Sequence, residues 1–209
     1  MADLDPIDDD SNLHELTHPG PSNSCEAYEI KKTINLVPRQ SGIYAWYFRN
    51  VPHSIPIDGC RHYEWQGYDY TLLYVGIAPK EPAKSGKQGR TLQERVKQHI
   101  NGNAESSTLR FSLGCLLGDQ IGIHLCRVKP KRFSDEKALT DWICKNAIVA
   151  WSLHEKPWQK EVHYILKLSP PLNIDCNKHH PFYVELSCIR YQAREIAKTY
   201  LQEVMNNEQ

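Results

Sequence analysis

The 209-residue sequence has no long hydrophobic run. No stretch approaches the roughly 20 consecutive apolar residues that a membrane-spanning helix needs. The first ten residues (MADLDPIDDD) are acidic, whereas a secretory signal begins with basic residues followed by an apolar segment. We therefore expect a soluble protein that has no membrane partner and is not exported by that route.

Paired cysteines are also missing. The seven cysteines are an odd number and include no CxxC pair, which argues against a disulfide framework and against a zinc ribbon. The expected compartment is therefore the reducing cytoplasm. Cys176, His179 and His180 come nearest to a metal cluster but lack a second ligand pair, so zinc is disfavoured there. A zinc-storage or zinc-regulated protein remains an alternative that metal analysis would reveal.

Basic residues are absent from the N-terminal end of the chain. Residues 1–30 contain eight acidic side chains and no Lys or Arg. The rest of the chain therefore carries all 25 basic side chains against 17 acidic ones, a net charge of +8 that the overall charge of zero conceals. This asymmetry keeps a nucleic-acid partner open, because phosphate contacts are usually supplied by Lys and Arg.

The positive charge is densest between residues 79 and 132. This interval contains eleven basic side chains and four acidic ones, Glu81, Glu94, Glu105 and Asp119. Such a run indicates either a polyanion-binding face or an ordinary solvated basic surface, and charge alone favours neither.

Composition divides the chain into a tail and one domain. Residues 1–28 combine acidic, Pro, Gly, Ser and Asn residues with few apolar side chains, which predicts an acidic disordered tail. Residues 29–209 are long enough for a single domain with a well-buried core.

Aromatic and β-branched residues mark two strands, 42–48 (GIYAWYF) and 71–77 (TLLYVGI), which we expect to be neighbours. The interval 49–70 between them contains two prolines and two glycines without a regular period, and it is expected to be a long loop or an excursion of the hairpin.

Helical periodicity follows. Thr91 and Glu94 form a predicted capping box for a helix over 92–101. The remaining expected elements are a helix from Ser107 or Thr108 to about Gly118, a strand at 121–128, a helix over 135–145 capped by Ser134, a strand at 147–153, a helical segment over 158–168 and an amphipathic C-terminal helix over 186–204. The predicted fold class is α+β, with a small mixed or antiparallel sheet flanked by helices.

Five separated sequence features can be compared with known families by their order along the chain. They are GIY at 42–44, YVG at 74–76, Arg95 four residues before His99 on a predicted helix, Glu161, and PPLN at 170–173. In this order the sequence resembles the GIY-YIG nuclease superfamily over residues 41–177, and it is closest in pattern to the restriction-endonuclease-type members. The resemblance implies the fold of that family and the hydrolysis of DNA phosphodiesters.

The resemblance implies that Tyr44 and Tyr74 point from adjacent strands into one site. Tyr44 would contact or deprotonate the attacking water, and Tyr74 would hold a phosphate oxygen or the water. A phenol has a pKa near 10, so Tyr44 as a base needs a nearby cation or acts only transiently. The sequence leaves both options open.

Arg95 and His99 are spaced i, i+4, so they lie on one face of their predicted helix. The resemblance makes Arg95 a ligand of a non-bridging phosphate oxygen, which suits its planar fork. His99 matches a histidine of the restriction-type members and would relay a proton or hold a phosphate.

By the same resemblance, Glu161 is the metal ligand. One carboxylate with several waters commonly holds Mg²⁺, for which Mn²⁺ can substitute. Glu155 is the competing acid but falls outside the helix that leads to PPLN. Asn173 would hydrogen-bond across the site or to the DNA backbone, and Asn177 is a weaker candidate of the same kind.

The separation of Tyr44 and Tyr74 by thirty residues exceeds that of minimal family members, so 49–70 is an insertion. Its His53, Arg61, His62, Trp65 and Tyr68 are available to DNA, and the other expected DNA-binding residues are Lys80, Lys84, Lys87, Arg90 and Arg110.

The function expected from the sequence is a Mg²⁺-dependent, restriction-like endonuclease for double-stranded DNA, with a homodimer as an open alternative to a single copy. A structure-directed repair nickase is the first alternative. A catalytically silent DNA-binding module on the same scaffold is the second, and it would be expected to lose Arg95 or Glu161.

Overall fold

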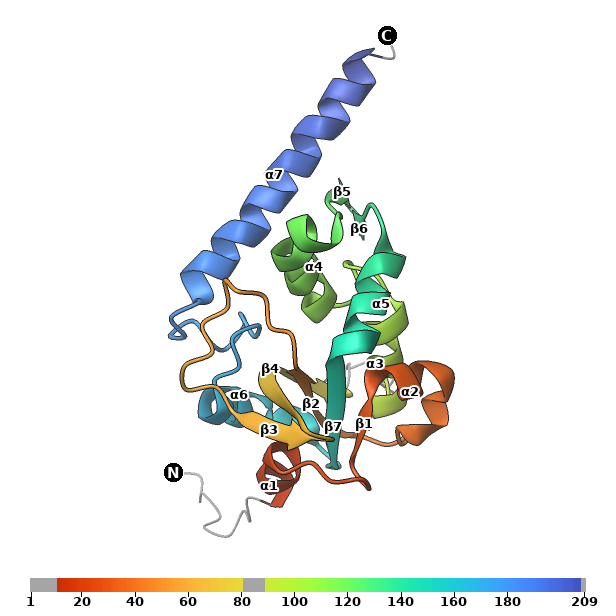
Figure 1. The fold of residues 1–209 in the computed structure, drawn as a ribbon, viewed down its shortest axis with the longest axis vertical. Coiled ribbons are helices and arrows are strands. Elements are labelled where there is room, and N and C mark those ends of the chain that lie inside the picture. Colours follow the sequence, from red (N-terminus) through yellow and green to blue (C-terminus); the bar gives the residue numbers. More distant parts are fainter. Residues whose placement is uncertain (1–10, 81–88, 208–209) are drawn as a thin grey trace.

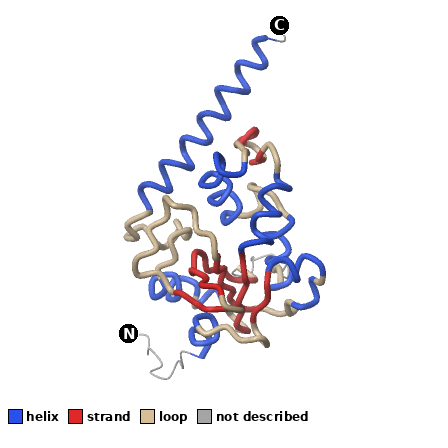
Figure 2. Tube along the Cα trace, in the orientation of Figure 1, coloured by secondary structure: helices blue, strands red, loops and turns tan. Residues whose placement is uncertain are grey.

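The computed structural model describes residues 11–80 and 89–207. Its centre is a five-stranded antiparallel sheet with the strand order β1-β7-β2-β4-β3, which confirms the α+β fold class (Figures 1 and 2). The strands are β1 (Ser24–Glu26), β2 (Gly42–Phe48), β3 (His62–Trp65), β4 (Tyr68–Ala78) and β7 (Ala147–Leu153). A separate two-stranded sheet pairs β5 (Leu125–Val128) with β6 (Lys131–Phe133).

Helices lie on both sides of the sheet (Figure 1). They are α1 (Ser11–Thr17), α2 (Ala27–Lys32), α3 (Leu92–Asn101), α4 (Thr108–Ile121), α5 (Glu136–Asn146), α6 (Glu161–Leu168) and α7 (Tyr183–Asn207), with short 3-10 helices at Ile34–Leu36 and Pro157–Gln159. The capping box predicted for α3 is present. In the described part of the chain, no helix combines the length and apolar character needed to cross a bilayer.

Strand alternation divides the core into two layers. Successive residues of β2 face opposite sides, so Tyr44 and Trp46 join the layer under α3, α4 and α5. Ile43, Ala45 and Tyr47 join the other layer, together with α1 and α6. β2 is central and buried on both faces, which is why it lacks polar positions.

The two predicted strands are neighbours, as expected. Tyr44 pairs with Gly76, and Trp46 pairs with Tyr74. The register shifts beyond this point, because Tyr47 pairs with Leu72 and leaves Leu73 as an extra residue. Tyr74 faces the same side as Tyr44 because it pairs with Trp46, and the β-bulge turns Leu73 to that side as well.

The N-terminal segment differs from the expected disorder. Residues 11–28 form α1, β1 and the start of α2, while residues 1–10 lie outside the described part of the chain. β1 pairs with β7, and Leu13 and Leu16 of α1 are buried against the sheet. Two apolar anchors and one edge pairing outweigh the polar composition of this segment.

Other boundaries also move. The interval 49–70 contains β3, which pairs with the first residues of β4, so half of the expected loop is a hairpin. The first-turn cap of α5 is Asp135, which accepts from the Ala138 amide, whereas Ser134 was expected. The expected strand at 121–128 shortens to β5, because α4 continues to Ile121.

Candidate active site

A cavity of about 110 Å³ opens where β2, β4, α3 and the segment around α6 meet. Five of the six predicted site residues line it: Tyr44, Tyr74, Arg95, Glu161 and Asn173. Lys80, predicted as a DNA contact, lines it too. Predicted site residues as far apart in sequence as Tyr44 and Asn173 therefore share one concave surface. The sixth predicted site residue, His99, lies behind this surface.

Tyr44 and Tyr74 reach the cavity from adjacent strands, and their ring centroids are 6.5 Å apart. The ring of Tyr44 lies directly over Gly76, where a Cβ atom would collide with the Tyr44 hydroxyl. The glycine of YVG is therefore required by the tyrosine of GIY. Burial raises the pKa of both phenols, and the charge of Arg95 opposes this effect, so both are protonated at neutral pH.

Arg95 is half-buried on α3, and its guanidinium is held at both ends. Its Nε donates to the Tyr44 hydroxyl oxygen at 3.3 Å. Its Nη1 donates to the Ser106 carbonyl oxygen at 2.8 Å and to the Gln98 side-chain oxygen at 2.5 Å. These bonds orient the charged group on the cavity wall, in reach of an anion bound there.

His99 does not reach the cavity, although it lies on the same helix as Arg95. Its side chain is fully buried, with Nε2 2.8 Å from the Tyr44 hydroxyl and Nδ1 2.7 Å from the Ser107 hydroxyl. A phosphate cannot reach either nitrogen, so that expected role is wrong. Burial, followed by the charges of Arg95 and Arg110, holds the pKa of His99 well below its usual range, and the ring is neutral.

Glu161 is the first residue of α6, and its carboxylate lines the cavity. It forms no hydrogen bond or ion pair with any residue that the structure describes. Burial raises its pKa, while Lys80 and Arg95 act in the opposite direction. A desolvated, unpaired carboxylate facing a polar cavity is a favourable partner for a cation.

The chemistry of the side chains on the cavity is compatible with a magnesium ion. Within residues 11–80 and 89–207 no cluster of three or more His, Cys, Asp or Glu side chains could form a protein cage. Mg²⁺ does not require a cage, since it keeps several waters and uses one or two carboxylates. Glu161 supplies one carboxylate. Asp175 lines the same cavity, and its negative charge is close enough to raise the pKa of Glu161.

Glu155, the competing acid, lies elsewhere. It lines a different cavity of about 530 Å³ together with Arg39, Arg90 and residues around the start of α3. Arg90, a predicted DNA contact, thus belongs to this neighbouring cavity and is exposed.

Asn173 and Asn177 stabilise the loop after α6. The Asn173 side-chain oxygen accepts from the Val75 amide at 2.9 Å, and its side-chain nitrogen donates to the Val75 carbonyl oxygen at 2.8 Å. Both functional ends are thus used to hold the PPLN loop against β4. Asn177 is fully buried and donates to the Pro170 carbonyl oxygen at 3.0 Å. The buried Asn177 has no access to DNA, whereas Asn173 lines the cavity and its bonds to Val75 correspond to the expected hydrogen bonds across the site.

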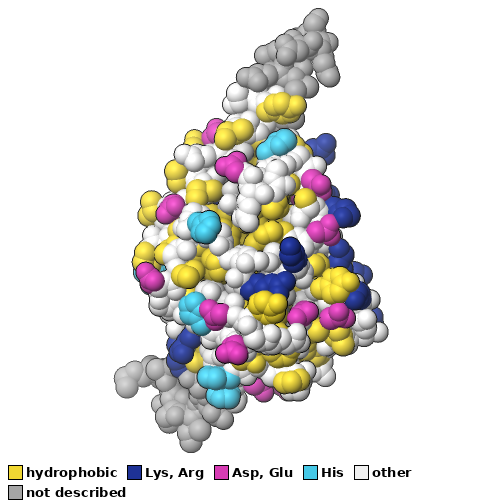
Figure 3. Space-filling model, viewed as in Figure 1, with side chains coloured by type: hydrophobic (Ala, Val, Ile, Leu, Met, Phe, Trp, Pro, Cys, Tyr) yellow, Lys and Arg dark blue, Asp and Glu magenta, His cyan; other side chains and the backbone are white. Residues whose placement is uncertain are grey.

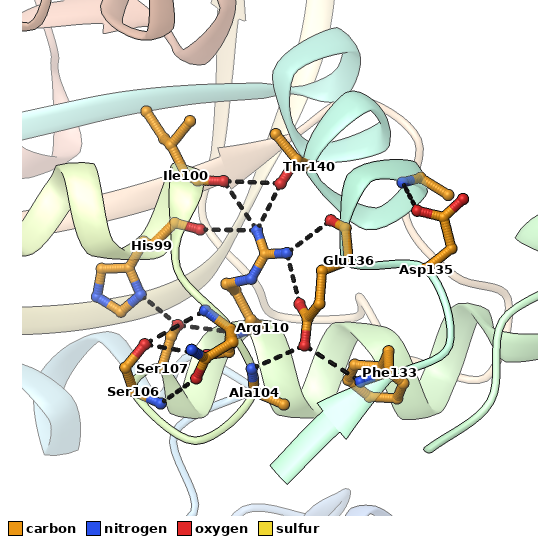
Figure 4. A network of polar contacts seen from close by, with 12 residues as sticks. His99, Ile100, Ala104, Ser106, Ser107, Arg110, Phe133, Asp135, Glu136 and Thr140 are labelled. Atoms are coloured by element: carbon orange, nitrogen blue, oxygen red, sulfur yellow. Dashed lines mark hydrogen bonds and ion pairs between the residues drawn. The ribbon is translucent and has the colours of Figure 1, made fainter. Parts of the chain in front are cut away.

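Arg110, another predicted DNA contact, is fully buried, so that expectation is wrong (Figure 4). Its Nη2 pairs with Glu136 at 2.7 Å, and its Nη1 donates to the Ile100 carbonyl oxygen at 2.8 Å and to the Thr140 hydroxyl at 3.0 Å. The guanidinium joins the C-terminal end of α3 to α4 and α5. Its function in this position is to fix the helices behind the cavity.

Two basic candidates remain, both in the segment between β4 and α3. Lys84 and Lys87 lie outside the described residues. On the face drawn in Figure 3, basic and acidic side chains are intermingled. The density of charge in sequence therefore does not by itself define one binding face.

Sequence reasoning missed three residues of the site. Thr108 and Asp175 line the cavity, and Ser107 contacts His99 from behind. Ser107 was recognisable as a helix cap, and its oxygen does accept from the Arg110 amide at 3.1 Å. Its second contact, to His99, depends on the crossing of α3 and α4 and has no local sequence signal. Cys176 also lines the cavity, and among the described residues it is not part of any group of three or more potential metal ligands.

Comparisons with known proteins agree with this geometry. No curated protein and no solved structure matches the chain. The protein-family model for the GIY-YIG catalytic domain matches residues 42–192, which is most of the chain and includes every residue of the cavity described above. The chain belongs to the GIY-YIG catalytic domain family.

Proposed function

We propose that the protein is a Mg²⁺-dependent endonuclease that hydrolyses phosphodiester bonds of double-stranded DNA. Membership of the family implies nuclease activity in general. The observation that carries the more specific proposal is the convergence of Tyr44, Arg95 and Glu161 on one cavity from three different elements.

Phosphodiester hydrolysis needs a nucleophilic water, a proton acceptor, and positive charge at the phosphate. Arg95 and Lys80 supply positive side chains on the cavity wall. Glu161 would hold Mg²⁺, or Mn²⁺ in its place, which when bound offsets the charge that develops on the phosphate. Tyr74 is placed to orient the water or a phosphate oxygen from the adjacent strand.

Tyr44 would accept the proton of the water as a phenolate, after its own proton has passed to solvent, and it is the group best placed to do so because its oxygen already faces two nitrogen partners. Burial favours its neutral form, so the phenolate must be stabilised by donors. Arg95 supplies one N–H donor at this oxygen. His99 supplies a second if the proton of its neutral ring is on Nε2.

A count of hydrogen bonds favours that tautomer. The Ser107 oxygen already accepts from the Arg110 amide, and its hydroxyl still has one proton to donate. Among the described residues, His99 Nδ1 is the acceptor within reach of that proton. In the proposed arrangement Nδ1 accepts this proton, and the ring proton is on Nε2, where it is donated to Tyr44. In this arrangement His99 is a positioning residue that stabilises the negative form of Tyr44.

A restriction-like role is the first reading of the cellular function. The long segment between β2 and β4 and the histidine on α3 support it, since both match the restriction-type members that the sequence resembles. Cutting both strands with one active site per chain usually requires two copies, so this role includes a homodimer. A structure-directed nickase would act as one copy.

Supercoiled plasmid DNA tests the activity and separates these readings. The protein is incubated with plasmid in Mg²⁺, in Mn²⁺ and in a chelator, and the products are resolved by topology. We expect cleavage with either metal and none with chelator. Linear products with defined ends support the restriction-like role, and open circles support the nickase. Intact plasmid in both metals, across varied plasmids, would favour the catalytically silent module.

A further inference from the structure

Two arginines of α7 form cation-π contacts with the same aromatic ring. Arg190 and Arg194 are spaced i, i+4, and their guanidinium carbons lie 4.8 Å and 5.0 Å from the ring centroid of Phe111. Phe111 is fully buried on α4. A third cation, Lys131, lies 5.9 Å from the same ring, but it is paired with Glu105 at 2.5 Å. Positive charge is thus concentrated where α7 crosses α4.

The two arginines lack acidic partners. Neither forms a hydrogen bond or an ion pair with any residue in the described part of the chain, and the buried Nε of Arg190 has no partner there. Arg110 shows the contrast, because its buried guanidinium is paired with Glu136 and bonded to carbonyl oxygens. Partial burial of a cation without an acceptor is unfavourable unless a ligand supplies one.

The electrostatics of Arg190 reflect this position. Burial, followed by repulsion from Arg194, lowers the pKa of Arg190. A guanidinium stays protonated at neutral pH despite such a shift. The pair therefore presents two charges that have no hydrogen-bonded acidic partner in the described part of the chain.

This arginine pair lies next to the active cavity. Phe111 is three residues after Thr108 on α4, so both side chains lie on the same face of the helix, and Thr108 lines the cavity. Asp175, also on the cavity wall, is close enough to act on the charge of Arg190. A DNA strand carries one phosphate per about 3.4 Å of helix axis, so a duplex with one phosphate in the cavity presents others beside it.

We propose that Arg190 and Arg194 form a second phosphate site, which binds the backbone of the same DNA next to the scissile phosphate. This inference rests on the proposed function. The Phe111 ring packs against both guanidinium groups, and the N–H donors of these groups suit phosphate oxygens. Because backbone contacts carry no base information, the site positions the duplex and does not read its sequence.

The test uses the full chain with Arg190→Met, Arg194→Met and the double variant. Methionine keeps an apolar stem against Phe111 and removes the charge. Binding of a short fluorescent duplex of mixed sequence is measured by anisotropy in chelator, over a series of salt concentrations. Lys198→Met is the matched control, because Lys198 is exposed on the same helix and paired with Glu195. Thermal unfolding of every variant is recorded in parallel.

Loss of each phosphate contact should make the slope of log affinity against log salt shallower by about 0.9. Lys198→Met should keep the wild-type slope. Removal of an uncompensated charge should leave the midpoint of thermal unfolding unchanged or raise it. Opposite effects on binding and on stability are the signature of a ligand site.

If the double variant unfolds earlier and binds DNA with the wild-type slope, the arginines only stabilise the α4–α7 contact and the proposal is overturned. Should methionine prevent folding, Arg190→Gln and Arg194→Gln provide the same comparison. Binding in chelator does not require cleavage, so this result is independent of the metal-dependent activity. Wild-type protein that cuts DNA while the arginine variants bind normally would reject the second site alone.

Discussion

Arg95 makes the clearest residue-scale prediction, because its fork contacts both Tyr44 and the Ser106 carbonyl group. Arg95→Lys keeps the charge and loses the fork. We expect DNA binding to survive and the cleavage rate to fall by about 10² to 10³, roughly 3 to 4 kcal/mol of transition-state stabilisation. Single-turnover cleavage with enzyme in excess measures this step.

Arg127→Lys is the matched control for Arg95→Lys, since Arg127 is exposed on β5. It should cut at the wild-type rate. Equal rates for the two lysine variants would make Arg95 an ordinary surface cation.

Ser107 provides a second residue-scale prediction. Nitrogen NMR of the wild-type protein should place the ring proton of His99 on Nε2. Ser107→Thr keeps both the cap and the donated proton, so the tautomer should not change. Ser107→Asp keeps the cap but can only accept, so the proton should move to Nδ1. A proton on Nδ1 in the wild type would show that His99 does not donate to Tyr44.

The resemblance predicted which residues lie at or near the cavity better than it predicted the contacts that they form. Arg95 and Glu161 lie on the cavity as expected. Asn173 lies on the cavity too and His99 lies behind it, but both form hydrogen bonds inside the protein. Arg110 is buried because the Glu136 carboxylate and three carbonyl oxygens surround it, and such tertiary partners leave no trace in local sequence.

At the scale of single elements, the site depends on the register of β4 against β2, in which Gly76 pairs with Tyr44. Gly76→Ala places a methyl group where the Tyr44 hydroxyl lies. Overpacking of this kind costs about 1–3 kcal/mol, and here it would push Tyr44 away from Arg95 and His99. We expect cleavage to be lost while duplex binding remains, as measured by single-turnover rates and anisotropy.

Gly20→Ala is the control for Gly76→Ala, because a Cβ there makes only an ordinary contact at 3.7 Å. It should leave both cleavage and binding unchanged. Wild-type cleavage by Gly76→Ala would mean that the position of Tyr44 is not critical.

Most elements were predictable from periodicity and capping. α3 and β2 occupy the expected residues, since an amphipathic stripe with a capping box and an aromatic strand are strong local signals. The bulge at Leu73 and the hairpin of β3 were not predictable, because they depend on pairing partners and not on local pattern.

At the scale of the whole molecule, the N-terminal segment is part of the fold. Leu16 is fully buried, and the Tyr47 hydroxyl donates to its carbonyl oxygen at 2.7 Å. Leu16→Ala should therefore reduce the free energy of unfolding by about 2–5 kcal/mol. Urea denaturation measures this, and Leu36→Ala, at an exposed position, should cost far less. Equal midpoints for the two variants would show that α1 is not docked on the sheet.

Composition predicted disorder for residues 11–28 because it averages over all side chains of the segment and ignores their positions. Residues 11–28 have few apolar side chains, yet Leu13 and Leu16 fall on one face of a short helix, and β1 meets the free edge of β7. The charge asymmetry of the chain was correct as a count, but the structure distributes the basic residues between the cavity, its neighbour and the core.

The central claim is that the cavity around Tyr44 and Glu161 cleaves DNA with a metal held by Glu161. The most direct measurement compares single-turnover cleavage by Glu161→Gln and Glu155→Gln in Mg²⁺, with duplex binding recorded for both. Each variant removes one negative charge, and the two acids lie on different cavities. We predict no cleavage but retained binding for Glu161→Gln, and the wild-type rate for Glu155→Gln. Wild-type cleavage by Glu161→Gln would contradict the claim.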